Sequence, residues 1–275
     1  MKSITCKGQL IALDTPKVMG ILNLTPDSFY DGGNYMDEKS ILAQAEHMIT
    51  EGATFIDLGA YSSRPGADDV AEEEELKRLL PFIKLLLDHF PKLLLSIDTF
   101  RANVARQTIE AGAALINDIS AGKLDKNMLQ TVADFQVPYV MMHMRGTPQT
   151  MKTRTQYDDL VKEILFYFSE RAAQARKVGI NDLIVDPGFG FAKTIDQNFE
   201  LLNKLELFKA LDFPLLAGLS RKSTIYKTLN IEPAEALNGT TVLNTIALTK
   251  GASILRVHDV KPAMEAVKLF NKLLK

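Results

Sequence analysis

Four polar side chains that are far apart in the sequence could together bind a planar heterocycle. They are Asp98, Asn117, Asp186 and Lys222, and each follows a short apolar run. They offer carboxylate acceptors, one amide and one cation. A carboxylate can accept both hydrogens of a donor–donor edge at once, such as the edge of a 2-amino-pyrimidinone ring. The set therefore predicts a site for such a ring.

A second set of side chains is cationic or hydroxylic and suits a phosphate or diphosphate. It consists of Asn23, Ser63, Arg64, Arg256 and His258. Arg256 stands at the end of an apolar run, and burying an unpaired cation there would be costly. We therefore interpret Arg256 as a functional residue.

Each of these residues also has a structural interpretation when it is taken alone. Asp98 could cap the next helix, and Asn117 could satisfy backbone groups at a strand end. His258 could be a satisfied structural histidine, and Lys222 could be a solvated surface lysine. His143, which lies between two methionines, favours a structural role. The presence of polar groups after every apolar run favours a catalytic site over these separate explanations.

Eight short apolar runs supply the elements that would position these residues. Each run is nearly continuous rather than alternating, which is typical of parallel strands covered on both faces. The runs are Val18–Leu22, Thr54–Leu58, Leu93–Ile97, Ala114–Ile116, Pro138–Met142, Leu183–Val185, Pro214–Ala217 and Ser253–Val257. Helix-like segments lie between them, at 37–51, 71–90, 103–112 and 157–179 among others. This alternation predicts an α/β fold, a closed (β/α)8 TIM barrel, with its active site at the carboxyl ends of the strands.

Other segments complete the expected fold. The first sixteen residues lie outside the strand–helix units and could form a small N-terminal hairpin across the barrel floor. Asp68 and Asp69 are candidates to cap the helix over 71–90, and the four glutamates at 72–75 suit the positive end of its dipole. Gly, Pro and Ser do not cluster as a linker anywhere, so we expect residues 1–275 to form a single domain.

One glycine-rich segment, "GFGFAKT" at 188–194, is similar to a phosphate-binding loop but lacks its pattern. That motif needs a glycine directly before the lysine and another five residues earlier, where this chain has Ala192 and Pro187. Phe189 and Phe191 indicate an aromatic wall instead.

Composition excludes several classes of function. The net charge of −2 argues against a general nucleic-acid binder, which usually has a basic excess. Cys6 is the single cysteine, so an internal disulfide and a cysteine-based zinc site are excluded and a reducing compartment is favoured. We see no signal peptide, and no apolar stretch reaches about 18 residues. We therefore expect a cytoplasmic protein without a nucleic-acid or membrane partner.

Seven segments, in order along residues 18–260, give the chain a family resemblance. They are "NLTPDSFYDGG", "SSRPGA", "SIDT", "INDIS", "DPGFGF", "GLSRKS" and "RVHDV". Together they resemble the bacterial dihydropteroate synthases. That family joins 6-hydroxymethyl-7,8-dihydropterin diphosphate to 4-aminobenzoate, releases pyrophosphate and forms the folate precursor 7,8-dihydropteroate. The resemblance implies the same activity, a pterin-binding barrel and a homodimer.

The resemblance also implies roles for individual residues. The pterin edge would be held by Asp98, Asn117, Asp186 and Lys222, and Arg256 would stack on its face. The diphosphate would be held by Asn23, Arg256 and His258, with Mg²⁺ between Asn23 and the phosphates. The aminobenzoate site would be shaped by Ser63, Arg64, Pro65, Phe191, Lys222 and Ser223. The catalytic members of these sets would be Asn23, Lys222, Arg256 and His258.

The first loop would be the family's mobile loop, which closes once diphosphate is present. Its residues are Thr25, Asp27, Ser28, Phe29 and Asp31. Either aspartate could stabilise positive charge on the pterin. The reaction is expected to be dissociative, with the C–O bond breaking before the weakly nucleophilic amine attacks. One departure is Tyr61, which stands where the family commonly has an acidic residue.

Two other functions compete with this interpretation. A methyltetrahydrofolate–corrinoid methyltransferase would share the pterin edge residues but would need no diphosphate site. A non-catalytic pterin-binding regulator would be expected to have lost the diphosphate ligands. The segments "TPDSF" and "SRKS", together with Asn23, Arg256 and His258, favour the synthase.

Overall fold

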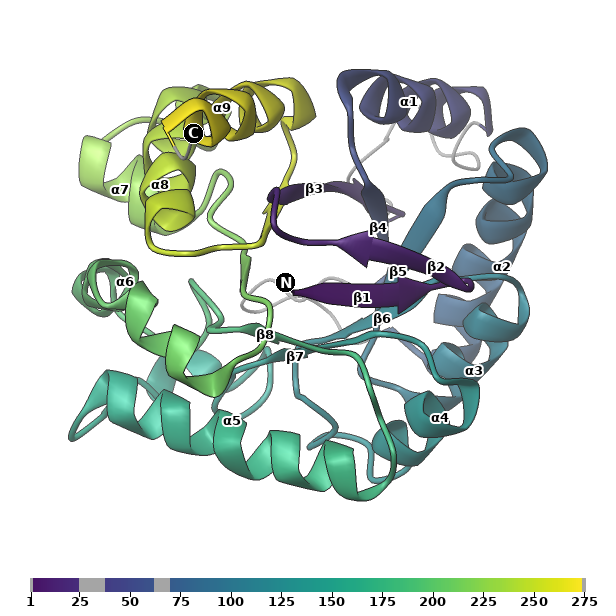
Figure 1. Ribbon diagram of the computed structural model, residues 1–275, viewed down its shortest axis with the longest axis horizontal. Coiled ribbons are helices and arrows are strands. Elements are labelled where there is room, and N and C mark those ends of the chain that lie inside the picture. The colour runs from purple at the N-terminus through teal and green to yellow at the C-terminus, as the bar shows by residue number, and fades with distance from the viewer. Residues whose placement is uncertain (1, 25–37, 62–69, 274–275) are drawn as a thin grey trace.

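The computed structural model is a barrel of eight parallel strands surrounded by helices, and it describes residues 2–24, 38–61 and 70–273 (Figure 1). The barrel strands are β3 (Lys17–Asn23), β4 (Phe55–Gly59), β5 (Leu94–Asp98), β6 (Leu115–Asp118), β7 (Tyr139–Met142), β8 (Leu183–Asp186), β9 (Leu216–Ala217) and β10 (Ile254–Val257). They follow each other in the order β8-β7-β6-β5-β4-β3-β10-β9. A parallel bridge between Val185 and Leu215 closes the ring. The predicted (β/α)8 barrel is therefore confirmed.

Helices follow the strands and cover the outside of the barrel (Figure 1). Their bounds are α1 (Glu38–Glu51), α2 (Glu72–His89), α3 (Ala102–Glu110), α4 (Met128–Phe135), α5 (Leu160–Lys177), α6 (Ile195–Asn203), α7 (Ser223–Leu229), α8 (Leu237–Thr249) and α9 (Val260–Leu273). Short 3-10 helices span Met151–Thr153, Leu205–Leu211 and Pro233–Glu235. None of the helices within the described ranges is long and apolar enough to cross a membrane.

Helix α2 differs from the sequence-based expectation at its N-terminus. Its N-cap is Ala71, which makes no side-chain cap hydrogen bond, and the predicted caps Asp68 and Asp69 lie outside the described residues. Its glutamates are also not all dipole-facing surface groups. Glu75 is 1 % exposed, and its Oε2 accepts a hydrogen bond from Arg101 Nη1 at 2.5 Å. A buried carboxylate needs such a partner, and the sequence pattern of four glutamates did not reveal it.

The predicted N-terminal hairpin closes the amino end of the barrel. Its strands β1 (Ser3–Cys6) and β2 (Gln9–Ala12) pair antiparallel, and the hairpin lies across the barrel in Figure 1. Ile4, Cys6 and Leu13 pack against the first inward-facing residues of the strands, such as Met19 and Phe55. Burial raises the pKa of the Cys6 thiol to about 12. Because a thiol is nucleophilic only as the thiolate, Cys6 is a packing residue here.

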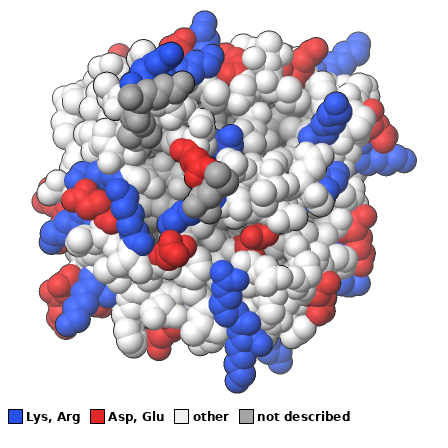
Figure 2. Space-filling model, in the orientation of Figure 1, with Lys and Arg blue, Asp and Glu red and all other residues white. Residues whose placement is uncertain are grey.

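Acidic and basic side chains are interspersed over the face of the molecule seen in Figure 2. This mixture agrees with a net charge of −2. The charged groups that matter for chemistry lie inside the carboxyl end of the barrel instead.

Candidate active site at the carboxyl end of the barrel

A largely buried network of charged and polar side chains links four strands inside the barrel. Arg256 of β10 donates from Nε to Asp57 Oδ2 at 2.6 Å and from Nη2 to Asp98 Oδ2 at 2.8 Å. Asn117 of β6 donates from Nδ2 to the same Asp57 oxygen at 3.0 Å. Asp98 and Asn117, predicted to bind the heterocycle, are therefore neighbours of Arg256, predicted to bind the diphosphate.

Asp57 is the member of this network that the sequence analysis missed. It lies in the middle of β4, is fully buried, and its Oδ1 accepts no hydrogen bond from the described residues. The available signal was a carboxylate inside the apolar run 54–58. Such a group is stable only when a cation or several donors face it, so Asp57 and Arg256 each account for the burial of the other.

Asp98 is held in the site rather than used as a helix cap. The first backbone N–H of α3, at Ala102, donates to Asp125 Oδ2 at 2.8 Å. Burial raises the pKa of the Asp98 carboxyl to about 7; Arg256 opposes this shift, and the nearby charge of Asp57 adds to it. The capping alternative for Asp98 is therefore wrong.

Asn23 lies beside Asp98 across a glycine. A β-carbon placed on Gly59 would be 3.5 Å from Asp98 Cβ and 3.7 Å from Asn23 Oδ1. The bare backbone of Gly59 thus leaves these two side chains facing a common space at the ends of β3, β4 and β5.

Lys222 forms a second part of the site, together with the loop that follows β8. Its Nζ donates to the carbonyl oxygen of Phe189 and lies 5.0 Å from the centre of the Phe191 ring. Burial lowers the pKa of Lys222 to about 8, and attraction to Asp186 opposes that shift. Lys222 is therefore not the solvated surface lysine of the alternative interpretation.

Asp186 faces Lys222 from the end of β8. Its Oδ1 accepts the backbone N–H of Gly188 at 2.8 Å, and burial raises the pKa of its carboxyl while Lys222 lowers it. A β-carbon on Gly218 would lie 3.8 Å from Lys222 Nζ and 4.0 Å from Arg256 Cβ. The small residue at 218 therefore brings the Lys222 and Arg256 parts of the site together.

The loop after β9 is fixed to the loop after β10. Arg221, at φ +52°, donates to both carboxylate oxygens of Asp259 at 2.8 Å. Ser220 Oγ accepts the backbone N–H of His258 at 3.2 Å and lies 3.0 Å from its Nδ1. The His258 side chain is exposed at this mouth, and Ser223 begins α7 one residue after Lys222.

Several predicted residues fall outside the described ranges. These are Thr25, Asp27, Ser28, Phe29 and Asp31 of the first loop and Ser63, Arg64 and Pro65 of the second. Tyr61, directly before the second loop, is buried and packs edge-to-face on Phe100 at 5.1 Å. Its hydroxyl accepts a hydrogen bond from Gln149 Nε2 at 2.9 Å.

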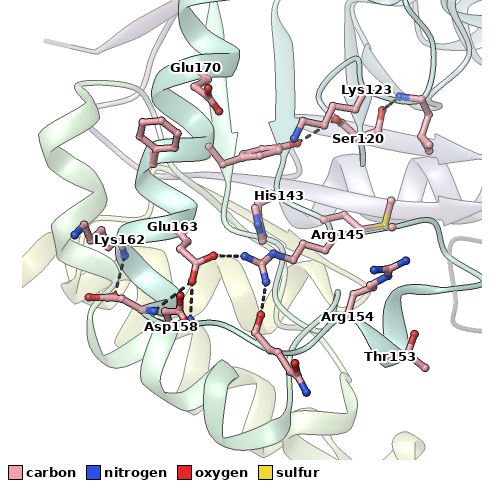
Figure 3. Close-up of a pocket in the computed structure, with 17 residues that line it drawn as sticks. Ser120, Lys123, His143, Arg145, Thr153, Arg154, Asp158, Lys162, Glu163 and Glu170 are labelled. Carbon is pink, nitrogen blue, oxygen red and sulfur yellow. Dashed lines mark hydrogen bonds and ion pairs between the residues drawn. The ribbon is translucent and has the colours of Figure 1, made fainter.

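A separate surface pocket of about 1080 Å³ lies beside the barrel mouth, between α5 and the loop after β7 (Figure 3). Arg145 crosses it to reach Glu163 and the backbone oxygen of Gln156, and His143 forms part of its wall. None of the residues selected as catalytic lines this pocket. Arg145 and Glu163 form an ion pair in its wall. We assign the chemistry to the barrel mouth, because the residues selected as catalytic lie there.

The ligands available for a magnesium ion at this site are few. The described residues contain no group of three or more His, Cys, Asp or Glu side chains that could hold a metal. Mg²⁺ is commonly held by one or two protein oxygens together with substrate phosphates. The amide oxygen of Asn23, beside Gly59, could serve as one such protein oxygen.

Comparisons with known proteins give one consistent result. A sequence model of the family described as "Pterin binding enzyme" matches residues 19–258. The chain is similar to the dihydropteroate synthase of Escherichia coli K12, at 42% identity over 265 residues, 96% of this chain and 93% of that protein. It is similar to the Yersinia pestis dihydropteroate synthase solved with a sulfonamide drug complex, at TM-score 0.93 and 40% identity, covering 99% of both chains. It is also similar to the Xanthomonas albilineans dihydropteroate synthase solved with 4-aminobenzoic acid, at TM-score 0.92 and 40% identity, covering 99% of this chain and 98% of the other.

Proposed function

The chain belongs to the pterin-binding enzyme family that includes the dihydropteroate synthases, and from this premise we propose how its residues perform that reaction. The substrates are 6-hydroxymethyl-7,8-dihydropterin diphosphate and 4-aminobenzoate, and the products are 7,8-dihydropteroate and pyrophosphate. The observation that carries the proposal is the convergence of Asp98, Asn117 and Arg256 with Asp186 and Lys222 at one end of the barrel.

The pterin would bind among the buried carboxylates. Asp186 and Asp98 each present acceptor oxygens, and Asn117 adds an amide whose Nδ2 is already fixed by Asp57. A 2-amino-pyrimidinone edge supplies the matching donors. Arg256 would lie against the ring, since Asp57 and Asp98 orient its guanidinium from one side.

The substitution would begin with cleavage of the C–O bond, and the diphosphate would leave with the electron pair. The electron-rich ring beside that carbon supports the resulting cation, and the surrounding carboxylates stabilise it. The amine nitrogen of 4-aminobenzoate then forms the C–N bond and loses one proton. If the C–O bond breaks first, the site must stabilise a cation on the pterin and negative charge on the diphosphate. No strong base is required.

The diphosphate would be held by Arg256 and His258 at the mouth. Nε and Nη2 of Arg256 are used by the two aspartates, while Nη1 makes no hydrogen bond to the described residues. Asn23 would contribute its amide oxygen to Mg²⁺, which neutralises negative charge on the phosphates when it is bound. The first-loop residues Asp27 or Asp31 would add negative charge beside the pterin.

The aminobenzoate would lie beside Phe191, Lys222 and Ser223, with Ser63, Arg64 and Pro65 supplied by the second loop. The Phe191 ring and the Lys222 ammonium are in contact, at 5.0 Å from Nζ to the ring centre, so an aromatic carboxylate would meet an apolar surface and a cation together. This matches the chemistry of 4-aminobenzoate.

We also propose that the chain forms a homodimer in the cytoplasm. Apolar side chains stand exposed on α7 and α8, with Leu229 at 53 %, Leu237 at 36 % and Val242 at 50 %. Neighbouring exposed apolar groups of this kind favour a protein interface. Light scattering at several concentrations would test the dimer, and a monomer at all of them would contradict it.

Pyrophosphate release tests the activity most directly. The chain is incubated with dihydropterin diphosphate and Mg²⁺, with and without 4-aminobenzoate, and pyrophosphate is measured. Release that depends on 4-aminobenzoate and yields dihydropteroate supports the synthase. Pterin binding without release would favour the regulator, and methyl transfer from methyltetrahydrofolate to a corrinoid would favour the methyltransferase.

A further inference from the structure

The loop that follows β8 has a cation buried beneath it that the proposed reaction does not use. Lys193 is 9 % exposed, and its Nζ donates to the carbonyl oxygens of Gly188 at 2.9 Å and Phe191 at 3.0 Å. The third contact of Nζ is with Nδ1 of His143, at 3.2 Å. An ammonium group has three donors, so these contacts use all of them.

Burying the Lys193 ammonium costs desolvation energy, and polar contacts as well as packing hold it in place. Burial lowers the pKa of Lys193 to about 7, and attraction to Asp186 opposes the shift. Burial and the charge of Lys193 hold the pKa of His143 well below its usual range, so the imidazole is neutral and can accept a hydrogen bond. An apolar side chain of similar length would fill this space without the desolvation cost.

The loop above Lys193 has three residues in the left-handed region of backbone conformation, one of which is not a glycine. Gly188, Gly190 and Ala192 all have positive φ, at +74°, +82° and +49°. A β-carbon on Gly188 would come within 2.1 Å of the His143 carbonyl oxygen, so the loop passes directly against the segment after β7. Within the loop the Phe191 N–H donates to the Gly188 oxygen at 3.1 Å, while Ala192 is the residue whose positive φ is strained, so contacts from outside the loop help to maintain this shape.

Those contacts reach almost every peptide of the loop. Lys193 holds the carbonyls of residues 188 and 191, Tyr157 donates its hydroxyl to the Ala192 oxygen at 2.9 Å, and Asn198 Oδ1 accepts the Gly190 N–H at 2.7 Å. A further carbonyl of the loop, that of Phe189, accepts from Lys222. The loop is thus hydrogen-bonded both to Lys193, through residues 188 and 191, and to Lys222, through Phe189.

We propose that Lys193 is a positioning residue that fixes the 188–192 loop so that the Phe191 ring and the Lys222 ammonium are set at the correct separation for 4-aminobenzoate. This inference rests on the proposed function. Lys193 touches neither substrate and acts through the two groups that do. His143, which also walls the pocket in Figure 3, is the fixed support on the far side of Lys193.

The test compares Lys193→Met with Tyr157→Phe and with a matched control. Methionine keeps the apolar length of lysine and removes all three donors, whereas Tyr157→Phe removes one hydroxyl from the same loop. Lys204→Met is the control, because Lys204 is exposed at the C-terminal end of α6, where it forms an ion pair with Glu200 at 2.8 Å. For each protein, KM is measured separately for 4-aminobenzoate and for the pterin diphosphate, with kcat and the melting temperature.

We expect Lys193→Met to raise KM for 4-aminobenzoate about ten- to hundredfold, because small misplacements of binding groups are costly. KM for the pterin diphosphate should rise clearly less than KM for 4-aminobenzoate. Tyr157→Phe should show a smaller shift in the same direction, and Lys204→Met should match the wild type. If Lys193→Met does not fold, Tyr157→Phe decides the question alone.

Two results would overturn the inference. One is an unchanged KM for 4-aminobenzoate in the loop variants that fold; the other is an equal rise in KM for both substrates with a lowered melting temperature, which describes a general structural role. Either result in an active wild type leaves the proposed function intact. A wild type that releases no pyrophosphate would refute the proposed function and this inference with it.

Discussion

Arg256 of β10 and Asp57 of β4 bind each other across the intervening strand β3, with 2.6 Å between Nε and Oδ2. Asp98 takes a second nitrogen of the same guanidinium at 2.8 Å. The arginine at the centre of the site is therefore oriented before any substrate arrives. Preorganised charges of this kind need no rearrangement as the reaction proceeds, which is how they contribute most to rate.

Asp57→Asn should weaken pterin binding even though Asp57 is not assigned to contact the substrate. The change keeps the shape of the side chain but removes the charge that holds Arg256 Nε and Asn117 Nδ2. We expect a loss of about 1–3 kcal/mol in calorimetric pterin affinity. Asp182→Asn is the control, since the Asp182 carboxylate accepts the backbone N–H of Thr5 at the barrel floor, at 2.9 Å. Equal affinity in the wild type and Asp57→Asn would contradict the assigned role.

Asp186→Asn should act on the pterin edge itself. An amide at this position can still accept the Gly188 N–H, but it cannot accept two donors from the ring with a full negative charge. We expect pterin affinity to fall by about 1–3 kcal/mol, because a donor edge would be left poorly matched in a buried site. Calorimetry that gives an unchanged affinity would remove Asp186 from the pterin site.

The site should have a narrow pH optimum. Burial raises the pKa of Asp98 to about 7, so its carboxylate is lost as the pH falls through that value. Burial lowers the pKa of Lys222 to about 8, so its ammonium is lost as the pH rises through that value. We expect kcat/KM for the pterin diphosphate, at saturating 4-aminobenzoate, to be bell-shaped with its maximum between these pKa values.

The alkaline limb of this profile can be assigned by substitution. Arginine stays protonated throughout the range, so Lys222→Arg should lose the fall above pH 8 whatever its absolute activity. A wild-type profile that is flat between about pH 6 and pH 9 would show that neither group controls the reaction.

The sequence predicted the barrel well because parallel strands covered on both faces leave a strong apolar signal. The predicted run 183–185 became β8 at Leu183–Asp186, while the run 214–217 shortened to β9 at Leu216–Ala217. Strand ends are less predictable, because hydrogen bonds to neighbouring strands decide them. The cap of α2 was wrong for a related reason: capping depends on where the chain enters the helix, which spacing does not fix.

Site residues at strand ends were easier to predict than those inside strands. Asp98, Asn117 and Asp186 follow apolar runs, where a barrel is expected to have its chemistry. Asp57 lies within a run and was treated as part of it, although its charge needed the partner that Arg256 supplies. Lys193 was considered only as the lysine of the glycine-rich segment 188–194, and its contacts with His143 and two carbonyls depend on a loop shape that sequence patterns do not define.

The final prediction concerns which step the cations at the mouth serve. His258 is exposed beside Ser220, and Arg256 precedes it by two residues on the same strand end. If C–O cleavage precedes attack, negative charge on the diphosphate is greatest in the transition state. His258→Ala should then lower kcat about 10²–10³-fold, the usual cost of losing one such donor, with little effect on aminobenzoate binding.

Ring-substituted aminobenzoates separate this order of events from its alternative. In a dissociative reaction, the rate at saturation depends weakly on the basicity of the attacking amine, both in the wild type and in His258→Ala. His47→Ala, which removes an exposed histidine paired with Glu51 on α1, should leave the rate unchanged. A steep dependence on amine basicity in the wild type and in His258→Ala would mean that attack drives the reaction. Arg256 and His258 would then serve to bind the diphosphate rather than to stabilise its departure.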